Sequence, residues 1–162
     1  MIAFARADSA HHAGIMQVVT AAFDARFGEG WNPGQIDSAL VSNDRVGEVA
    51  VDDGQIVGFS LSRYAANEAE LLLVAVLPEW RRRGVGATLI SRAIAEVERR
   101  GADAIFLEVR DANHAASALY RAQGFAPVGR RKAYYAGQDQ RRYDAITMRR
   151  CLNFTGRIDI AL

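Results

Sequence analysis

The sequence has few features of a secreted, membrane or metal-binding protein. Its 162 residues include one cysteine, Cys151, which cannot form a disulfide within the chain, so we expect a cytoplasmic protein. No apolar run approaches the roughly 20 residues of a membrane span. The N-terminus lacks the basic start and apolar stretch of a signal peptide. No spacing of His, Cys, Asp or Glu predicts a metal site.

The chain also has no large excess of charge of either sign. Twenty Lys and Arg residues against 19 Asp and Glu residues give a formal net charge of +1. The whole-chain charge therefore gives no reason to expect nucleic acid or a membrane surface as a partner. Half of the residues are hydrophobic, as in ordinary globular proteins. The length suits one domain, which we predict over residues 1–152, followed by a C-terminal tail at residues 153–162.

Apolar periodicity predicts the element order β-α-α-β-β-β-α-β-α-β-β. The predicted strands are Ile2–Arg6, Val46–Val51, Gln55–Tyr64, Ala69–Leu77, Ala104–Val109, Phe125–Tyr135 and Tyr143–Met148. The predicted helices begin after Asp8, Asn32, Gly84 and Asn113. This order predicts an α/β (α+β) fold, in which a mixed central sheet with one βαβ unit is flanked by helices.

The most informative segment is Leu71–Arg100, in which an apolar strand leads into a glycine loop and an amphipathic helix. The closely spaced Gly84 and Gly86 allow several backbone N–H groups to point at one spot. The helix adds unpaired N–H groups and the positive end of its dipole. The preceding Arg81–Arg83 add charges that can bind phosphate oxygens. The segment therefore predicts a pyrophosphate-binding loop.

The sequence of this loop argues against two common kinds of nucleotide-binding site. A P-loop needs G-x-x-x-x-G-K-[ST], and the chain has no lysine or serine in the required place. A dinucleotide-binding fold is a closer rival, because Glu108 lies at about the right distance to meet a ribose. However, Leu89 replaces the third glycine, and three strands precede the motif where that fold has one.

The six residues from Arg81 to Gly86 fit [QR]-x-x-G-x-[GA], and so resemble the acyl-CoA pyrophosphate signature of the GNAT N-acetyltransferases. Residues 69–149 further resemble the ribosomal-protein-alanine N-acetyltransferase branch. The shared segments are Val74-Ala75-Val76, LEVR at Leu107–Arg110, Asn113, ALY at Ala118–Tyr120, GF at Gly124-Phe125, RRKAYY at Arg130–Tyr135 and DAITM at Asp144–Met148. The first half of the chain resembles the branch in layout, with Trp31 where the branch tends to carry a tryptophan.

This resemblance implies the GNAT acyl-CoA N-acyltransferase fold, with acetyl-CoA as co-substrate. The predicted strand that leads into the loop would splay from its parallel neighbour, Ala104–Val109. An N–H at Val76 would face the thioester oxygen. Residues 82–87 would surround the pyrophosphate. The cofactor-binding residues implied are Val74, Ala75, Val76, Arg81, Arg82, Arg83, Gly84, Val85, Gly86, Ala87, Asn113 and Tyr120.

Two catalytic residues are implied by the same resemblance. Glu108 would be the general base, since a carboxylate in an apolar strand is costly without a task or a partner. Its structural alternative is a buried ion pair with Arg110 or another arginine, and Glu70 is a competing base. Tyr120 would protonate the departing thiolate, or it is an ordinary packed tyrosine. Asn113 is a good helix N-cap, and capping alone would explain it.

We therefore predict acetyl transfer from acetyl-CoA to a protein N-terminal α-amine, with an N-terminal alanine of a ribosomal protein as the favoured acceptor. Direct attack in a ternary complex fits the lack of an evident nucleophile, because Cys151 lies after the last predicted strand. Two alternatives remain open. The acceptor could be a small amine such as an antibiotic, a polyamine or an amino acid. The chain could also be a sensor that binds acetyl-CoA without turnover.

Overall fold

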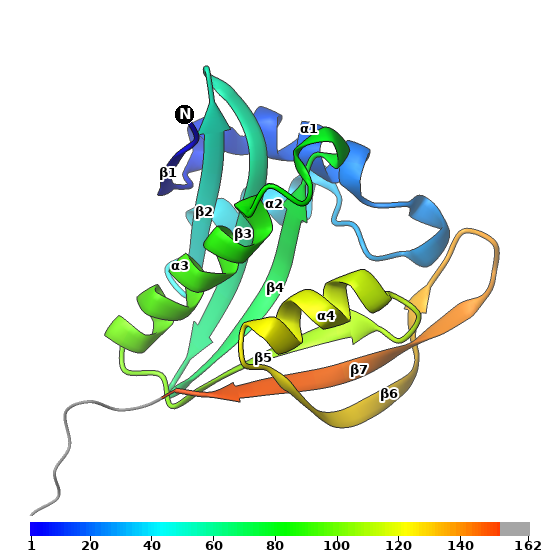
Figure 1. The fold of residues 1–162 in the computed structure, drawn as a ribbon. Helices are drawn as coiled ribbons and strands as arrows, with labels where there is room; N and C mark the ends of the chain where they lie inside the picture. Colours follow the sequence, from blue (N-terminus) through cyan, green and yellow to red (C-terminus); the bar gives the residue numbers. More distant parts are fainter. Residues whose placement is uncertain (153–162) are drawn as a thin grey trace, which may run out of the picture.

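The structure is a computed structural model that describes residues 1–152, so the predicted tail lies outside the described residues. A seven-stranded sheet has the order β1-β2-β3-β4-β5-β7-β6, with helices on both of its faces (Figure 1). The strands are β1 (Ala3–Arg6), β2 (Arg45–Asp52), β3 (Gln55–Ala65), β4 (Glu68–Val76), β5 (Ala104–Arg110), β6 (Ala126–Ala136) and β7 (Arg142–Cys151). The helices are α1 (His12–Ala22), α2 (Pro33–Val41), α3 (Val85–Arg99) and α4 (His114–Ala122). The predicted element order and fold class are confirmed.

Side-chain caps fix both ends of the loop between α1 and α2. Asp24 caps a short 3₁₀ turn, Ala25–Phe27, by accepting a hydrogen bond from the Arg26 N–H at 2.9 Å. At the start of α2, the Asn32 side chain accepts from the Gln35 N–H, and the Gln35 side chain accepts from the Asn32 N–H, both at 2.9 Å. This reciprocal capping box satisfies two otherwise unpaired N–H groups. The loop is therefore anchored by local hydrogen bonds at both ends.

The sheet opens between its two parallel strands. β4 and β5 pair over only three positions, Glu68–Glu70 against Ala104–Phe106, and beyond Glu70 they separate. The hydrophobic core divides at the same place into one cluster around β2 and β3 and another around β5 and the rest of α3. Val74 packs against both clusters. The expected splay is therefore present, and it leaves one edge of each parallel strand without a partner strand.

The last strand is longer than predicted. β7 continues to Cys151, because it pairs with the whole length of β5, from Arg110↔Ala145 to Ala104↔Cys151. The prediction that Cys151 follows the last strand was therefore wrong, since the basic residues before it hid the end of the strand. Within the described residues, no helix is long and apolar enough to cross a membrane.

The packing of α3 against the sheet predicts how much stability is lost when a buried side chain of this helix is truncated. Leu89 is fully buried, so Leu89→Ala should lower the free energy of unfolding by about 2–5 kcal/mol. Ser91→Ala, on the exposed side of the same helix, should change it by less than about 0.5 kcal/mol. Urea denaturation of both variants measures the difference. Equal stability of the two variants would contradict the assigned packing of α3.

Candidate active site

The glycine loop presents free backbone donors at the start of α3. Gly84 has φ 81° and ψ 0°, a left-handed conformation that favours glycine, and no side chain caps the helix there. The first N–H to be paired inside the helix is that of Thr88, which donates to Gly84 O at 3.0 Å. The N–H groups of residues 85–87 precede this bond and have no intrahelical acceptor. Such a cluster suits an anion.

The three predicted phosphate-binding arginines differ in their surroundings. Arg81 donates to the carbonyl oxygens of Val76 at 3.3 Å and Ala22 at 3.2 Å, so its guanidinium ties α1 to the end of β4. Arg83 lies over the ring of Trp80, with its Cζ 4.9 Å from the ring centre. Arg82 is exposed and has a φ of 58°. The side chain of Arg81 thus has a structural role that the sequence did not reveal.

The separated edge of β4 carries the backbone groups predicted to bind the cofactor. The Leu77 N–H donates to Val57 O of β3 at 2.9 Å. Because successive peptide groups of a strand point to opposite edges, the backbone of Val76 and Val74 faces the gap beside β5. By the same alternation, the backbone of Ala75 faces β3. Of the three residues predicted to bind through their backbones, Ala75 is therefore the one that is poorly placed.

A cavity of about 210 Å³ lies beside this gap. Five parts of the chain contribute to its wall: the loop between α1 and α2, β4, β5, α4 and β6. Its polar and aromatic lining includes Glu29, Trp31, Glu70, Glu108, Arg110, Asn113, Tyr120, Tyr134 and Tyr135. The structure thus brings the predicted catalytic residues Glu108 and Tyr120 and the competing base Glu70 to one cavity.

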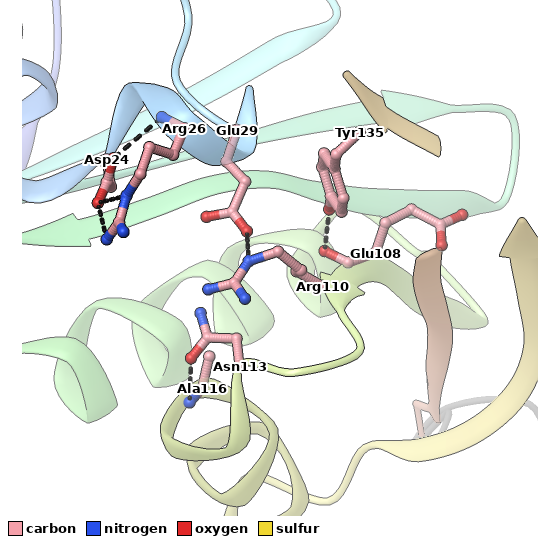
Figure 2. Close-up of polar contacts among 8 residues, drawn as sticks. All are labelled: Asp24, Arg26, Glu29, Glu108, Arg110, Asn113, Ala116 and Tyr135. Carbon is pink, nitrogen blue, oxygen red and sulfur yellow. Dashed lines mark hydrogen bonds and ion pairs between the residues drawn. The ribbon is translucent and has the colours of Figure 1, made fainter. Parts of the chain in front are cut away.

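The carboxylate of Glu108 is 10% exposed and has two partners. One oxygen accepts a hydrogen bond from Thr147 Oγ1 at 2.8 Å, and the other lies 3.0 Å from Arg131 Nε. Figure 2 shows this side chain directed away from Glu29 and Arg110. The ion pair considered as the structural alternative therefore exists, and its partner is Arg131.

The competing carboxylate, Glu70, is paired as well. Its Oε2 accepts a hydrogen bond from Arg63 Nη2 at 2.7 Å. This contact joins β3 to β4 close to the point where β4 leaves β5. Both predicted bases therefore have an arginine partner.

The sequence did not single out Glu29, which lies in the cavity wall. Its Oε1 accepts a hydrogen bond from Arg110 Nε at 2.6 Å, and the two side chains are only 16% and 13% exposed (Figure 2). Arg110 also lies over the ring of Phe27, with 3.6 Å from Cζ to the ring centre. Because the two partners are 81 residues apart in sequence, no local pattern could have identified this pair.

Two tyrosine hydroxyls share this negative surrounding. Burial, and secondly the charge of Glu29, raises the pKa of Tyr120 above its usual range. The same two causes raise the pKa of Tyr135, whose hydroxyl donates to the backbone oxygen of Glu108 at 3.2 Å. Both hydroxyls are therefore protonated at neutral pH. The Asn113 side chain accepts from the Ala116 N–H at 3.2 Å, which confirms its capping role.

Metal-ligating side chains and the cysteine thiol do not form a second site in the described part of the chain. Within residues 1–152, no three His, Cys, Asp or Glu side chains lie close enough together to hold a metal ion. Cys151 is exposed at the end of β7 and does not line the cavity.

Comparisons with known proteins identify relatives of the chain. A sequence model of the Acetyltransferase (GNAT) family matches residues 14–125. The [Ribosomal protein bS18]-alanine N-acetyltransferase of Escherichia coli K12 is 40% identical over 96 residues, which are 59% of this chain and 64% of that protein. The chain thus spans less than two thirds of that relative. The N-alpha-acetyltransferase RimI of Mycobacterium tuberculosis is 38% identical over 126 residues, which are 74% of this chain and 75% of that protein.

A solved structure shows the same fold. The crystal structure of the ribosomal-protein-S18-alanine N-acetyltransferase from Escherichia coli superposes with a TM-score of 0.86 at 28% identity and covers 98% of both chains. The Arabidopsis thaliana NAA60 structure in complex with acetyl-CoA has a TM-score of 0.83 at 18% identity, which supports the fold alone.

The raised pKa of Tyr120 predicts a specific titration result. At pH 10 in the native protein, Tyr120→Phe should lower the phenolate absorbance at 295 nm by well under half of the signal of one tyrosine, because burial raises the pKa of Tyr120 above its usual range. In guanidinium chloride, where its pKa returns to about 10, the two proteins should differ by about half of the signal of one tyrosine. A native difference at pH 10 of about half of the signal of one tyrosine, as for an unperturbed pKa of about 10, would show that Tyr120 is not in a raised-pKa environment.

Proposed function

The chain belongs to the GNAT acetyltransferase family, since the family model matches residues 14–125, and on this premise we propose that it acetylates a protein N-terminal α-amine. The donor is acetyl-CoA, and the favoured acceptor is the N-terminal alanine of a ribosomal protein, as in the names of the curated relatives. Residues 1–152 would act as one domain, in the cytoplasm. The observation that carries the proposal is the open β4–β5 edge, which links the free N–H groups of α3 to a cavity holding carboxylates and a protonated tyrosine.

The residues present fit the pyrophosphate of the donor. The uncapped start of α3 offers the N–H groups of residues 85–87, and Arg82 and Arg83 add positive charge beside them. A residue with a side chain would be strained at the positive φ of Gly84, so glycine allows this turn, which places the N–H donors. Arg81 would act indirectly, by holding the end of β4 through Val76 O.

The open edge of β4 fits the extended arm of the donor. Val74 and Val76 would hydrogen-bond the arm as a neighbouring strand would, and the N–H of Val76 would stabilise negative charge on the thioester oxygen. When bound, acetyl-CoA supplies the activated acetyl group. The side chain of Asn113, which caps α4 at the cavity wall, would present its amide to the same arm.

Proton transfers are assigned to side chains of the cavity. Glu108 would accept the proton lost by the amine, once substrate displaces the exposed Arg131 from its carboxylate. Tyr120 would donate a proton to the departing sulfur, for which its protonated state at neutral pH is suitable. Among residues 1–152 the cavity wall contains no Cys or Ser nucleophile, which favours direct attack by the amine without an acyl-enzyme.

The size and charge of the cavity favour a small, positively charged acceptor end. At about 210 Å³ the cavity is smaller than the roughly 300–1,000 Å³ of sites for drug-sized ligands. Its wall includes three carboxylates, on Glu29, Glu70 and Glu108, and one guanidinium, on Arg110. An α-ammonium with a short side chain, such as that of alanine, meets both conditions.

An acceptor panel tests this function. Thiol release from acetyl-CoA should be seen with an eight-residue peptide that begins with alanine and contains one lysine. The same peptide with its N-terminus already acetylated should give none. Turnover of small amines alone would contradict the proposal in favour of a small-molecule acetyltransferase, and CoA binding without any turnover would contradict it in favour of a sensor.

Isosteric substitutions test which carboxylate is the base. Glu108→Gln should lower kcat by about 10²–10⁴-fold, the usual contribution of a general base. Glu70→Gln should have a much smaller effect, and Glu98→Gln, on the exposed side of α3, should have none. Steady-state kinetics with the alanine peptide measures all three variants. A larger loss for Glu70→Gln than for Glu108→Gln would assign the base to Glu70.

A further inference from the structure

Glu29 has no part in the proton transfers assigned above, although it lies in the wall of the same cavity. We propose that the carboxylate of Glu29, oriented by Arg110, binds the positively charged α-amine of the acceptor and so determines acceptor affinity. The inference rests on the proposed function and adds a recognition residue to it. Four features of the surroundings of Glu29 support it.

The first feature is an oxygen that remains available. Arg110 Nε occupies Oε1 of Glu29, and among residues 1–152 no other group pairs with this carboxylate. Its Oε2 has no hydrogen-bond partner among residues 1–152 and is not fully buried. An ammonium entering the cavity can therefore bind this oxygen without displacing Arg110. Its hydrogen bond would be charge-assisted, and so stronger than a neutral one.

The second feature is a rigid setting. The ring of Phe27 lies beneath Arg110 and makes an edge-to-face contact with Tyr143, with ring centres 5.2 Å apart. The loop also touches the β6–β7 hairpin through backbone. A Cβ on Gly28 would lie 2.2 Å from Ala136 O, which only glycine avoids at this φ of 65°. Glu29 is therefore held between β5 and the hairpin before any acceptor arrives.

The third feature is the electrostatic effect of the Glu29 carboxylate on the tyrosine hydroxyls of the cavity. The carboxylates of Glu70 and Glu108 are paired with Arg63 and Arg131, which line a neighbouring cavity. Glu29 is paired with Arg110 inside this cavity. Besides burial, its charge raises the pKa of both Tyr120 and Tyr135, whereas the charge of Glu108 contributes at Tyr135 alone. A cation beside both hydroxyls would therefore lie close to the charge of Glu29.

The fourth feature is the division of tasks that this placement allows. Binding the ammonium favours its protonated form, which cannot attack a thioester. The proton must therefore leave to another group, and Glu108 is the candidate base in the same cavity wall. Glu29 is accordingly an acceptor-binding residue, and its removal should weaken acceptor binding more than it slows turnover at saturation.

Glu29→Gln isolates the charge, because the amide oxygen of glutamine can still accept the hydrogen bond from Arg110. The KM for the alanine peptide should rise about tenfold or more, as expected for the loss of one charge-assisted contact. The kcat should stay within about twofold, and the KM for acetyl-CoA should not change. Asp24→Asn is the matched control, since Asp24 lies in the same loop, pairs with Arg26 and does not line the cavity. An unchanged peptide KM, or a kcat loss as large as that of Glu108→Gln, would overturn the inference.

A peptide without the amine separates recognition from loop damage. The same peptide with propionyl in place of its N-terminal alanyl group should inhibit wild type and Glu29→Gln equally, because it has no charge for Glu29 to bind. An equal weakening of both peptides in the variant would mean a disturbed loop and would overturn the inference. If wild type fails to acetylate the alanine peptide, the proposed function fails by itself. Equilibrium binding of the two peptides to the CoA-bound protein then tests Glu29, whose substitution should abolish any preference for the alanyl peptide.

Discussion

The early end of the pairing between β4 and β5 is the constraint on which the rest of the structure depends. Parallel strands normally continue to satisfy each other's peptide groups, and an unpaired edge inside a sheet is costly unless another group takes its place. Here the pairing stops after three positions, and the core divides into two clusters on either side. The free edge of β4 and the cavity beside it follow from this separation.

Arginine side chains form ion pairs with the carboxylates of the cavity wall. Arg63, Arg110 and Arg131 each pair with a carboxylate of the cavity wall, and each comes from a different strand. Two of these arginines are about half exposed, so their pairs are screened by solvent, whereas the Glu29–Arg110 pair is largely buried. The buried Glu29–Arg110 pair is suited to hold a fixed geometry.

Much of the donor side could be predicted from the sequence, because backbone geometry dominates it. The strand, the Gly84 turn and the amphipathic α3 are local patterns that predicted the loop, and the resemblance to the family implied the splay. The acceptor side depends on contacts between distant segments, and so it was largely hidden. Glu29 meets a partner 81 residues away, and the partner of Glu108 proved to be Arg131. The structural role of Arg81 was missed for the same reason, since one of its acceptors is the carbonyl of Ala22.

Family membership implies less about the acceptor than about the donor, because the acceptor side depends on contacts between distant segments. The family match ends at residue 125, before the residues of β6 and β7 that hold Glu108 and face the cavity. Thr147 and Arg131 orient the candidate base, and Tyr135 contacts its backbone, all from beyond the matched segment. Backbone donors at a helix start can be supplied by many sequences, so donor binding can persist while side chains change. The proposed acceptor site lies where the α1–α2 loop meets the β6–β7 hairpin, at the contact that places Glu29.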